Sequence, residues 1–129
     1  MAWAAASAAA SAAVEFALVL PILLIVALGV VQIGLILRDQ LVLVEAARAG
    51  AREASVTEAA SEVQDAVDRA ASTLDVGRMS TDIERSGGQG RPVSVSLAYR
   101  DAPGVPFVGW LFPSVIKLDA EATMRQEFG

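Results

Sequence analysis

Glu15 is the residue in this sequence whose position most invites a chemical explanation. It is the only charged side chain among the first 37 residues, and the twenty-two residues from Phe16 to Leu37 carry no charge. Ala10 and Ser11 lie shortly before it, and their small side chains leave the backbone open to a protease. If the chain is cut between them, the new amine of Ser11 can neutralise a carboxylate on its own or a neighbouring helix, away from water. Alternatively, Glu15 is a flanking carboxylate in the headgroup zone of a membrane, where its cost is small.

Other groups that could carry catalysis are scarce. The chain has no Cys and no His, which excludes disulfides, thiolate catalysis, zinc sites with Cys or His ligands and a Ser-His-Asp triad. Asp119, Glu121 and Glu127 recur at strand spacing, and without a cleft signature we interpret them as a solvated strand face. The glycines of residues 87–90 are followed by neither a helix nor a GK[ST] motif, so they predict a hairpin turn. We therefore predict a protein that is not an enzyme and that holds no metal or cofactor.

The charge distribution bears on the kind of partner. The net charge is −5, and every charged residue except Glu15 follows Leu37. A nucleic-acid-binding domain would carry a basic stripe on its water-soluble part, so the acidic balance argues against a nucleic-acid partner.

The apolar run from Phe16 to Leu37 predicts a membrane-spanning helix, because 22 residues at about 1.5 Å each cross a hydrocarbon core of ~30 Å. Pro21, Gly29 and Gly34 lie within it and are tolerated in membrane helices, where they are candidates for helix packing. The two glycines are five residues apart and do not form a GxxxG face. Gln32 is the only strongly polar side chain in the span. The Gln32 side chain has two possible hydrogen-bond partners, which we weigh equally: a group across a helix interface, or the backbone of its own helix.

The helical pattern continues beyond the apolar run. Residues with small or apolar side chains recur at steps of three and four, and they are Leu43, Ala46, Ala47, Gly50, Ala51 and Ala54. This pattern predicts one continuous helix from about Ser11 to about Ala54, after a leader-like segment of residues 1–10. A capping box at residues 55–58 then predicts the start of a second, amphipathic helix, with an alanine-rich apolar face and Gly77 as its stop.

The last third of the chain predicts strands. Residues 79–85 are a weak candidate, residues 93–100 alternate with period two, and residues 115–125 alternate less regularly. We therefore predict an α+β fold in which a long N-terminal transmembrane helix continues into a small domain, residues 55–129. That domain contains the second helix and a small antiparallel sheet.

The loop of residues 101–113 is rich in aromatic side chains, with Phe107, Trp110 and Phe112. We favour packing over an edge of the sheet, because a domain this small needs its aromatic residues in the core. The alternative is an exposed patch that contacts a partner or the membrane surface.

About forty residues of the long helix, from Ala12 to Arg52, resemble the TadE-like family, pilin-like proteins of the tight-adherence (Tad/Flp) pilus systems. The residues that carry the resemblance are AAVEFALVLP at 12–21, QIG at 32–34, QL at 40–41 and AARAGAR at 46–52.

The resemblance implies a minor pilin or pseudopilin with a pilin-like fold, a structural protein that takes part in pilus assembly. It implies a single pass through the cytoplasmic (inner) membrane, a cytoplasmic N-terminus, an extracytoplasmic domain and a further location in the extracellular pilus. The implied partners are the membrane, other pilin subunits in an oligomer or filament, the pilus assembly platform and a prepilin peptidase that cuts between Ala10 and Ser11. Glu15 would then be the fifth residue of the mature chain, beside Phe16, and would set the register of assembly.

The first ten residues depart from the family pattern. Leaders of this kind usually end in Gly and carry basic residues, whereas here the leader ends in Ala10 and contains neither Lys nor Arg. A second function remains open, that of a bitopic membrane-anchored adaptor of a secretion or envelope complex that does not enter a filament.

Overall fold

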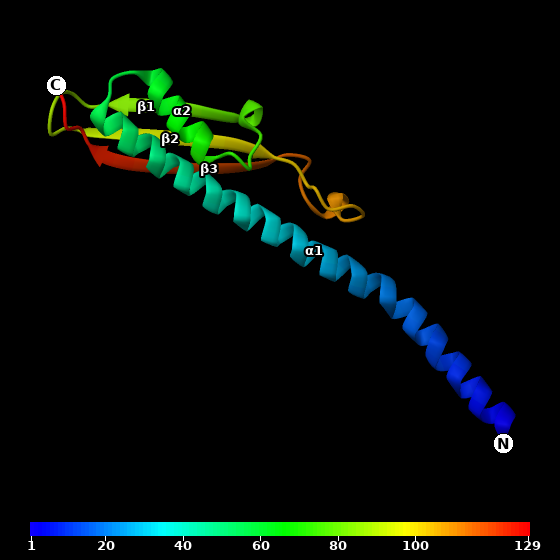
Figure 1. The fold of residues 1–129 in the computed structure, drawn as a ribbon. Helices are drawn as coiled ribbons and strands as arrows, with labels where there is room; N and C mark the ends of the chain where they lie inside the picture. Colours follow the sequence, from blue (N-terminus) through cyan, green and yellow to red (C-terminus); the bar gives the residue numbers. More distant parts are fainter.

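A single helix of 55 residues, α1 (Ala2–Val56), forms the axis of the molecule in the computed structural model, which describes residues 1–129 (Figure 1). At about 1.5 Å per residue, α1 is ~80 Å long. Its N-terminal half projects away from the rest of the chain, and its C-terminal half lies along the other elements. The predicted continuous helix is confirmed, although it begins at Ala2 rather than near Ser11.

Three antiparallel strands form one sheet in the order β1-β2-β3. They are β1 (Met79–Arg85), β2 (Pro92–Asp101) and β3 (Ile116–Arg125), and the register pairs Met79 with Tyr99 and Pro92 with Arg125. α1 and the short helix α2 (Ala60–Ala70) cover the same face of this sheet (Figure 1). The predicted α+β fold, a long apolar helix leading into a small helix-and-sheet domain, is confirmed. We call residues 57–129, together with the part of α1 that they cover, the head, and the projecting part of α1 the stem.

The alternation of β2 places its apolar side chains in the core of the head. Val93, Val95, Leu97 and Tyr99 are buried against the helices, whereas Ala98 and Arg100 on the other face of the sheet are exposed. Opposite β2, the small or apolar residues predicted to share one face of α1 are all buried. They are Leu43, Ala46, Ala47, Gly50, Ala51 and Ala54. Small side chains bury little area each, but they allow the backbones to approach closely.

At Gly50, α1 approaches both α2 and β2 closely. A Cβ atom at this position would lie 2.6 Å from Cγ2 of Val67 on α2 and 3.1 Å from Cγ1 of Val95 on β2. Both valines are fully buried and cannot move aside into solvent. The packing of α1 on both elements therefore requires a residue without a side chain here.

The turn between the two helices differs from the prediction. α1 includes Ser55, whose buried hydroxyl donates a hydrogen bond to the Arg52 carbonyl oxygen at 2.7 Å, so Ser55 does not cap a second helix. α2 begins at Ala60 after an uncapped Ala59, and the Thr57 hydroxyl accepts only the N–H of Ala59. The capping-box prediction is wrong because burial of Ser55 and Ala54 against the head extends α1 by a further half turn.

The predicted stop at Gly77 is also wrong. α2 ends at Ala70, and Gly77 lies in a separate 3-10 turn, η1 (Val76–Arg78), where its N–H donates to Asp75 Oδ1 at 3.0 Å. The apolar side chains of Ala71 and Leu74 remain buried in a turn that follows the helix. Ala71 and Leu74 are therefore buried, as the helical period predicted, although α2 ends before them.

The close approach at Gly50 generates a stability prediction. Gly50→Ala should lower the free energy of unfolding of the head by ~1–3 kcal/mol, because the added methyl group overlaps Val67. The gain in helix propensity, at most about 1 kcal/mol, offsets only part of this loss. Hydrogen exchange of the β2 amides in detergent-solubilised protein measures the effect. Gly29→Ala is the control, since a Cβ there meets nothing within 4 Å and should cause no loss. Equal protection in Gly50→Ala and wild type would contradict the packing described.

Candidate assembly site on the N-terminal helix

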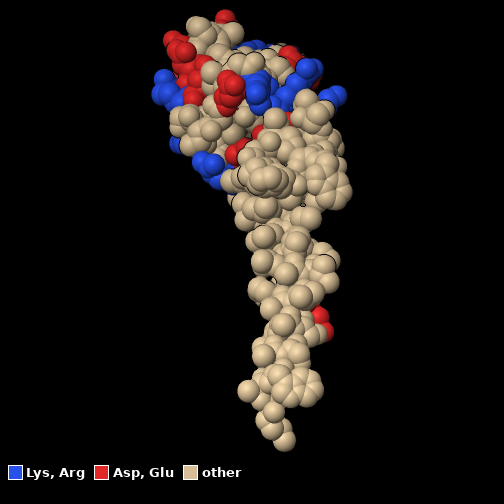
Figure 2. Space-filling view, turned by 90° about the vertical axis from the view of Figure 1, so that its right-hand side faces the viewer, with Lys and Arg blue, Asp and Glu red and all other residues tan.

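The stem presents an apolar surface that no other part of the chain covers. The most apolar 18-residue window of α1 has a mean hydropathy of 2.8, and only 6% of it is buried. Figure 2 shows the stem as a narrow column of uncharged atoms with a single acidic group on its side. By length and composition, this one helix is able to cross a membrane. Its exposed side chains require either lipid or other apolar helices around them.

Glu15 and Phe16 both project from the stem into the surroundings, and Phe16 is 62% exposed. Ala10 and Ser11 are exposed as well, and the peptide bond between them lies within the regular part of α1. Residues four apart on a helix lie on one face, one turn apart. An amine at Ser11 would therefore lie beside the carboxylate of Glu15. The cleavage and register roles of these four residues remain predictions.

No close packing within the chain is seen at the three helix-perturbing residues of the stem. Pro21 lies inside α1 and is exposed, and its missing N–H leaves the Ala17 carbonyl without its usual helical donor. Added Cβ atoms at Gly29 and Gly34 would meet nothing within 4 Å. Any role of these residues in packing between membrane helices therefore needs a second molecule and remains a prediction.

Gln32 has a partner that neither sequence-based alternative anticipated. Its side chain is 1% exposed, and Oε1 accepts hydrogen bonds from the N–H groups of Gly104 and Val105, both at 3.0 Å. These residues belong to the loop of residues 102–115 between β2 and β3, which we call the aromatic loop. The loop is therefore docked on α1 within the segment predicted to cross the membrane. The only sign of this contact in the sequence was a polar side chain within an apolar run. The partner of Gln32 could not be identified from the sequence, because it lies more than seventy positions away.

The aromatic loop buries its valines rather than its aromatic rings. Val105 and Val108 are buried, whereas Phe107 is 82% exposed, Trp110 is 72% exposed and Phe112 is half-buried. The favoured prediction, that the aromatic side chains pack over the sheet, is wrong for Phe107 and Trp110. The reason is that docking on Gln32 turns the loop towards the stem and away from the alanine-rich core. The alternative, contact with a partner or a membrane surface, remains a prediction.

Two carboxyl groups meet where α1 leaves the head. Asp101 at the end of β2 is buried, and its Oδ1 accepts the N–H of Ala102 at 2.8 Å. Burial, followed by the charge of Asp101, raises the pKa of the Asp39 carboxyl above its ordinary value of 3.8, and a hydrogen bond between the two side chains adds to the shift. The positive charge of Arg38 acts to lower the pKa of Asp39. Folding therefore makes Asp39, which lies beside the aromatic loop, easier to protonate than it is in the unfolded chain.

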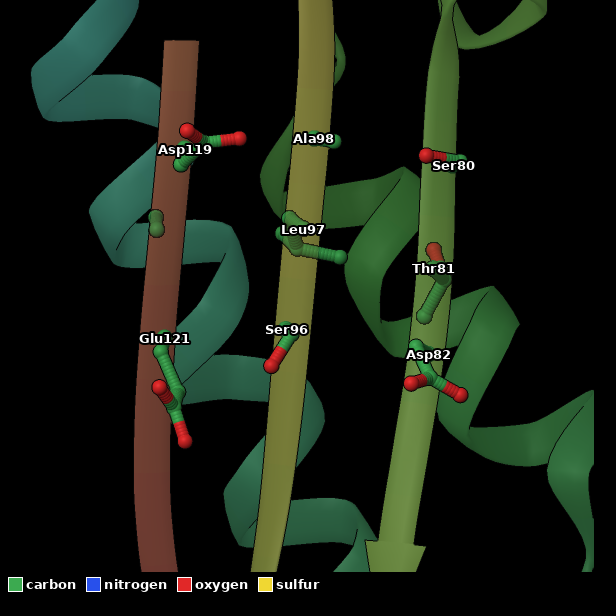
Figure 3. A pocket seen from close by; sticks show the side chains of 9 residues that line it. Ser80, Thr81, Asp82, Ser96, Leu97, Ala98, Asp119 and Glu121 are labelled. Atoms are coloured by element: carbon green, nitrogen blue, oxygen red, sulfur yellow. The ribbon is translucent and has the colours of Figure 1, made fainter.

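The sheet face opposite the helices is open to solvent. A shallow depression of about 390 Å³ lies over its centre, and Asp82, Asp119 and Glu121 point outward around small serine and alanine side chains (Figure 3). Glu127 lies beyond the end of β3 and is also exposed. No group of three or more potential ligands is placed to hold a metal ion. Asp119 and Glu121 form a solvated strand face, as predicted, whereas Glu127 lies outside the strand.

The carboxyl pair generates a pH prediction. A carboxyl whose pKa is higher in the folded state than in the unfolded state holds more protons when folded, so stability falls as the pH rises from about 3.8 through the raised value. Asp39→Asn keeps a donor beside Asp101 and removes this loss. We therefore expect Asp39→Asn to be more stable than wild type at neutral pH, with the difference disappearing in acid.

Thermal unfolding of the full chain in detergent micelles, compared between acidic and neutral pH, measures the difference. Asp65→Asn is the matched control, because Asp65 is exposed on α2 and this substitution should leave the pH slope of wild type unchanged. An Asp39→Asn profile parallel to that of wild type at all pH values would contradict the coupling.

Comparison with known proteins bears on the helix that carries this site. Residues 10–52 match the family model described as TadE-like protein. No curated protein and no solved structure matches the chain. The match spans Ala10, Ser11, Glu15 and Gln32 and ends at Arg52, within the part of α1 that packs in the head. The resemblance inferred from the sequence is confirmed for residues 10–52 of α1, which are similar to the TadE-like family.

Proposed function

We propose that this protein is a minor pilin or pseudopilin, a structural subunit that takes part in assembly of a Tad/Flp-type adhesive pilus. The observation that carries the proposal is the unpartnered apolar stem with Glu15 as its single charge, within a segment that matches the TadE-like family. The proposal also includes a cytoplasmic N-terminus, an extracytoplasmic head and processing by a prepilin peptidase.

Lateral association of stems accounts for the surface that the chain leaves uncovered. Large apolar side chains are exposed on all sides of the stem, for example Leu18 at 70%, Val26 at 59% and Val30 at 64%. In a membrane these side chains face lipid, and in a bundle of several subunits they face one another. The glycines at positions 29 and 34 leave space for a close approach of neighbouring helices.

Glu15 can set a specific register between neighbouring stem helices. An unpaired carboxylate in the middle of a bilayer costs at least ~2.5 kcal/mol, and a carboxylate in a bundle of apolar helices needs a compensating cation. The chain has no other charged side chain within the stem to provide one. After cleavage behind Ala10, the Ser11 amine of the same subunit would lie one helical turn from Glu15, and the amine of a neighbouring subunit could pair with Glu15 across the bundle. Pairing between subunits is possible only in a limited set of helix registers.

The first test of this function concerns Glu15. Glu15→Ala should reduce the amount of the protein in sheared filaments at least about tenfold, the equivalent of 1.4 kcal/mol of association free energy, while membrane insertion persists. Quantitative immunoblots of the sheared-filament and membrane fractions measure both. Glu58→Gln is the control, since Glu58 is exposed in the head and should not affect incorporation.

Two results would count against the proposal in different ways. Normal filament incorporation of Glu15→Ala would remove the register role of Glu15. Wild-type protein found only in the membrane fraction of piliated cells would favour the alternative function, a bitopic adaptor that does not enter the filament.

The second test concerns processing. Mass spectrometry of the protein from its native host should find Ser11 as the N-terminal residue, because a free amine is needed there to pair with Glu15. Replacing Ala10 by a bulky residue, as in Ala10→Leu, should leave the full-length chain. Wild-type protein that retains Met1 would contradict cleavage between Ala10 and Ser11.

A further inference from the structure

The aromatic loop carries a surface that is unusual for the water-exposed part of a protein. Residues 102–115 contain no charged side chain. Phe107 and Trp110 are exposed at 82% and 72%, and Leu111 and Val115 beside them are each 47% exposed. Phe107 also has a φ of 67°, a left-handed conformation that bulky residues rarely adopt. The loop thus holds Phe107 and Trp110 outward, and the backbone at Phe107 has an uncommon conformation.

The position of the loop along α1 coincides with the end of the apolar run. A hydrocarbon core of ~30 Å takes about 20 helical residues, so a core that begins at Phe16 ends near Leu35. Gln32, to which the loop is docked, lies about 5 Å short of this end at ~1.5 Å per residue. The exposed side chains of the loop therefore lie at the depth of the boundary between acyl chains and headgroups on the side of the head.

Several polar groups of the loop have hydrogen-bond partners within the protein. Gln32 accepts the N–H groups of Gly104 and Val105, and the Trp110 indole N–H donates to the Phe107 carbonyl oxygen at 2.9 Å. The Leu111 N–H donates to the Val108 carbonyl oxygen at 2.9 Å within the 3-10 turn η2 (Gly109–Leu111). Irregular backbone is tolerated at membrane depth only when its hydrogen bonds are made internally. The aromatic loop meets this requirement where it contacts α1, at the N–H groups of Gly104 and Val105.

We propose that the aromatic loop inserts into the lipid interface on the side of the head, with Phe107 and Trp110 as its anchors and Gln32 as the residue that positions it. Trp and Phe are favoured at this depth, where an apolar ring meets acyl chains and an indole N–H meets polar surroundings. The loop then fixes the rotation of α1 about its axis and the tilt of the head over the membrane. This inference rests on α1 crossing a membrane and not on incorporation into a filament.

Lipid fits this surface better than a partner protein does. The residues on either side of Gln32, to which the loop is docked, are exposed apolar side chains of the stem, Val31 at 52% and Ile33 at 50%. In Figure 2 the end of the head that meets the stem is largely uncharged, and most of the acidic and basic side chains gather farther from the stem. A protein interface at this site would bring polar groups to the rim of the patch.

Depth-dependent fluorescence quenching tests the proposal on the full chain. The protein has two tryptophans, so Trp3→Phe leaves Trp110 as the only one. This variant is reconstituted at low protein-to-lipid ratio into phosphatidylcholine–phosphatidylglycerol vesicles that contain lipids brominated at different depths. We expect Trp110 to be quenched most by shallow bromines, at a depth of about 5–10 Å from the headgroup boundary, and to be protected from aqueous iodide.

The control places a tryptophan at the opposite end of the sheet. Ser86 is exposed in the turn between β1 and β2, so Ser86→Trp in a Trp3→Phe/Trp110→Phe background should be quenched by iodide and not by brominated lipid. Quenching of Trp110 by iodide to the same extent as this control would overturn the proposal. Protection of Trp110 from both quenchers would also overturn it, because it would indicate contact between copies of the chain.

A second variant tests the positioning role of Gln32. Gln32→Met keeps a similar volume and removes the acceptor for Gly104 and Val105. We expect faster hydrogen exchange of these two amides and a severalfold loss of Trp110 quenching by brominated lipid, with unchanged exchange in β2 as the check that the head remains folded. Ile33→Met, at an exposed neighbouring position, is the matched control and should behave like wild type. Unchanged exchange and unchanged quenching in Gln32→Met would overturn the role of Gln32.

Discussion

The continuity of α1 across the boundary between stem and head is the constraint on which the rest of the structure depends. One helix of 55 residues carries both the apolar surface of the stem and the stripe of small residues on which the head packs. Neither Pro nor Gly occurs between Leu35 and Ala49, where the helix passes from one environment to the other. The helix is therefore stiff at this point, and the orientation of the head follows from the orientation of the stem. In an assembled bundle, the packing of stems would dictate the arrangement of heads.

The two halves of α1 are stabilised by different interactions. The stem exposes large aliphatic side chains and depends on lipid or neighbouring helices, whereas the other half buries alanine and glycine against α2 and the sheet. The C-terminus of α1 is held by Arg85, whose guanidinium donates to the carbonyl oxygens of Ala54 at 2.7 Å and Thr57 at 2.8 Å. A positive charge at this end also complements the helix dipole, and the guanidinium lies 5.4 Å from the centre of the Phe128 ring. One side chain of β1 thus connects the sheet, the end of α1 and the C-terminal residues.

The junction of stem and head combines three features within a few turns of α1. Gln32 holds the aromatic loop, the partly buried Asp39 lies beside the buried Asp101, and the aromatic loop exposes the rings of Phe107 and Trp110. Glu15 lies about 25 Å farther along the axis, at ~1.5 Å per residue. A subunit with these features has an uncharged middle section bounded by one carboxylate at its far end and by an aromatic patch at the head. This arrangement suits an element that must sit at one depth in a membrane and then associate side by side with similar helices.

The local patterns in the sequence were sufficient for most of the fold. The helical period identified the buried face of α1 from Leu43 to Ala54, and the alternation of β2 identified its core side chains, because burial on one side imposes these periods directly. The match of the family model to residues 10–52 agrees with motifs that are contiguous in the chain. Glu15 was also identifiable from the sequence, since a single charge beside a long uncharged run is a local feature.

Only the tertiary structure decided which groups meet across long separations in the chain. The pairing of Gln32 with Gly104 and Val105, the meeting of Asp39 with Asp101 and the outward aromatic rings all depend on where the sheet places the loop between β2 and β3. The capping-box signal at residues 55–58 was overridden for the same reason, because burial of Ser55 against the head outweighed a weak local preference. The sequence by itself determined that this chain has an apolar stem, a helix-and-sheet head and one carboxylate at the start of the apolar run. The tertiary structure decided how the head is held against the stem, since hydrogen bonds between distant segments leave no periodic trace in the sequence.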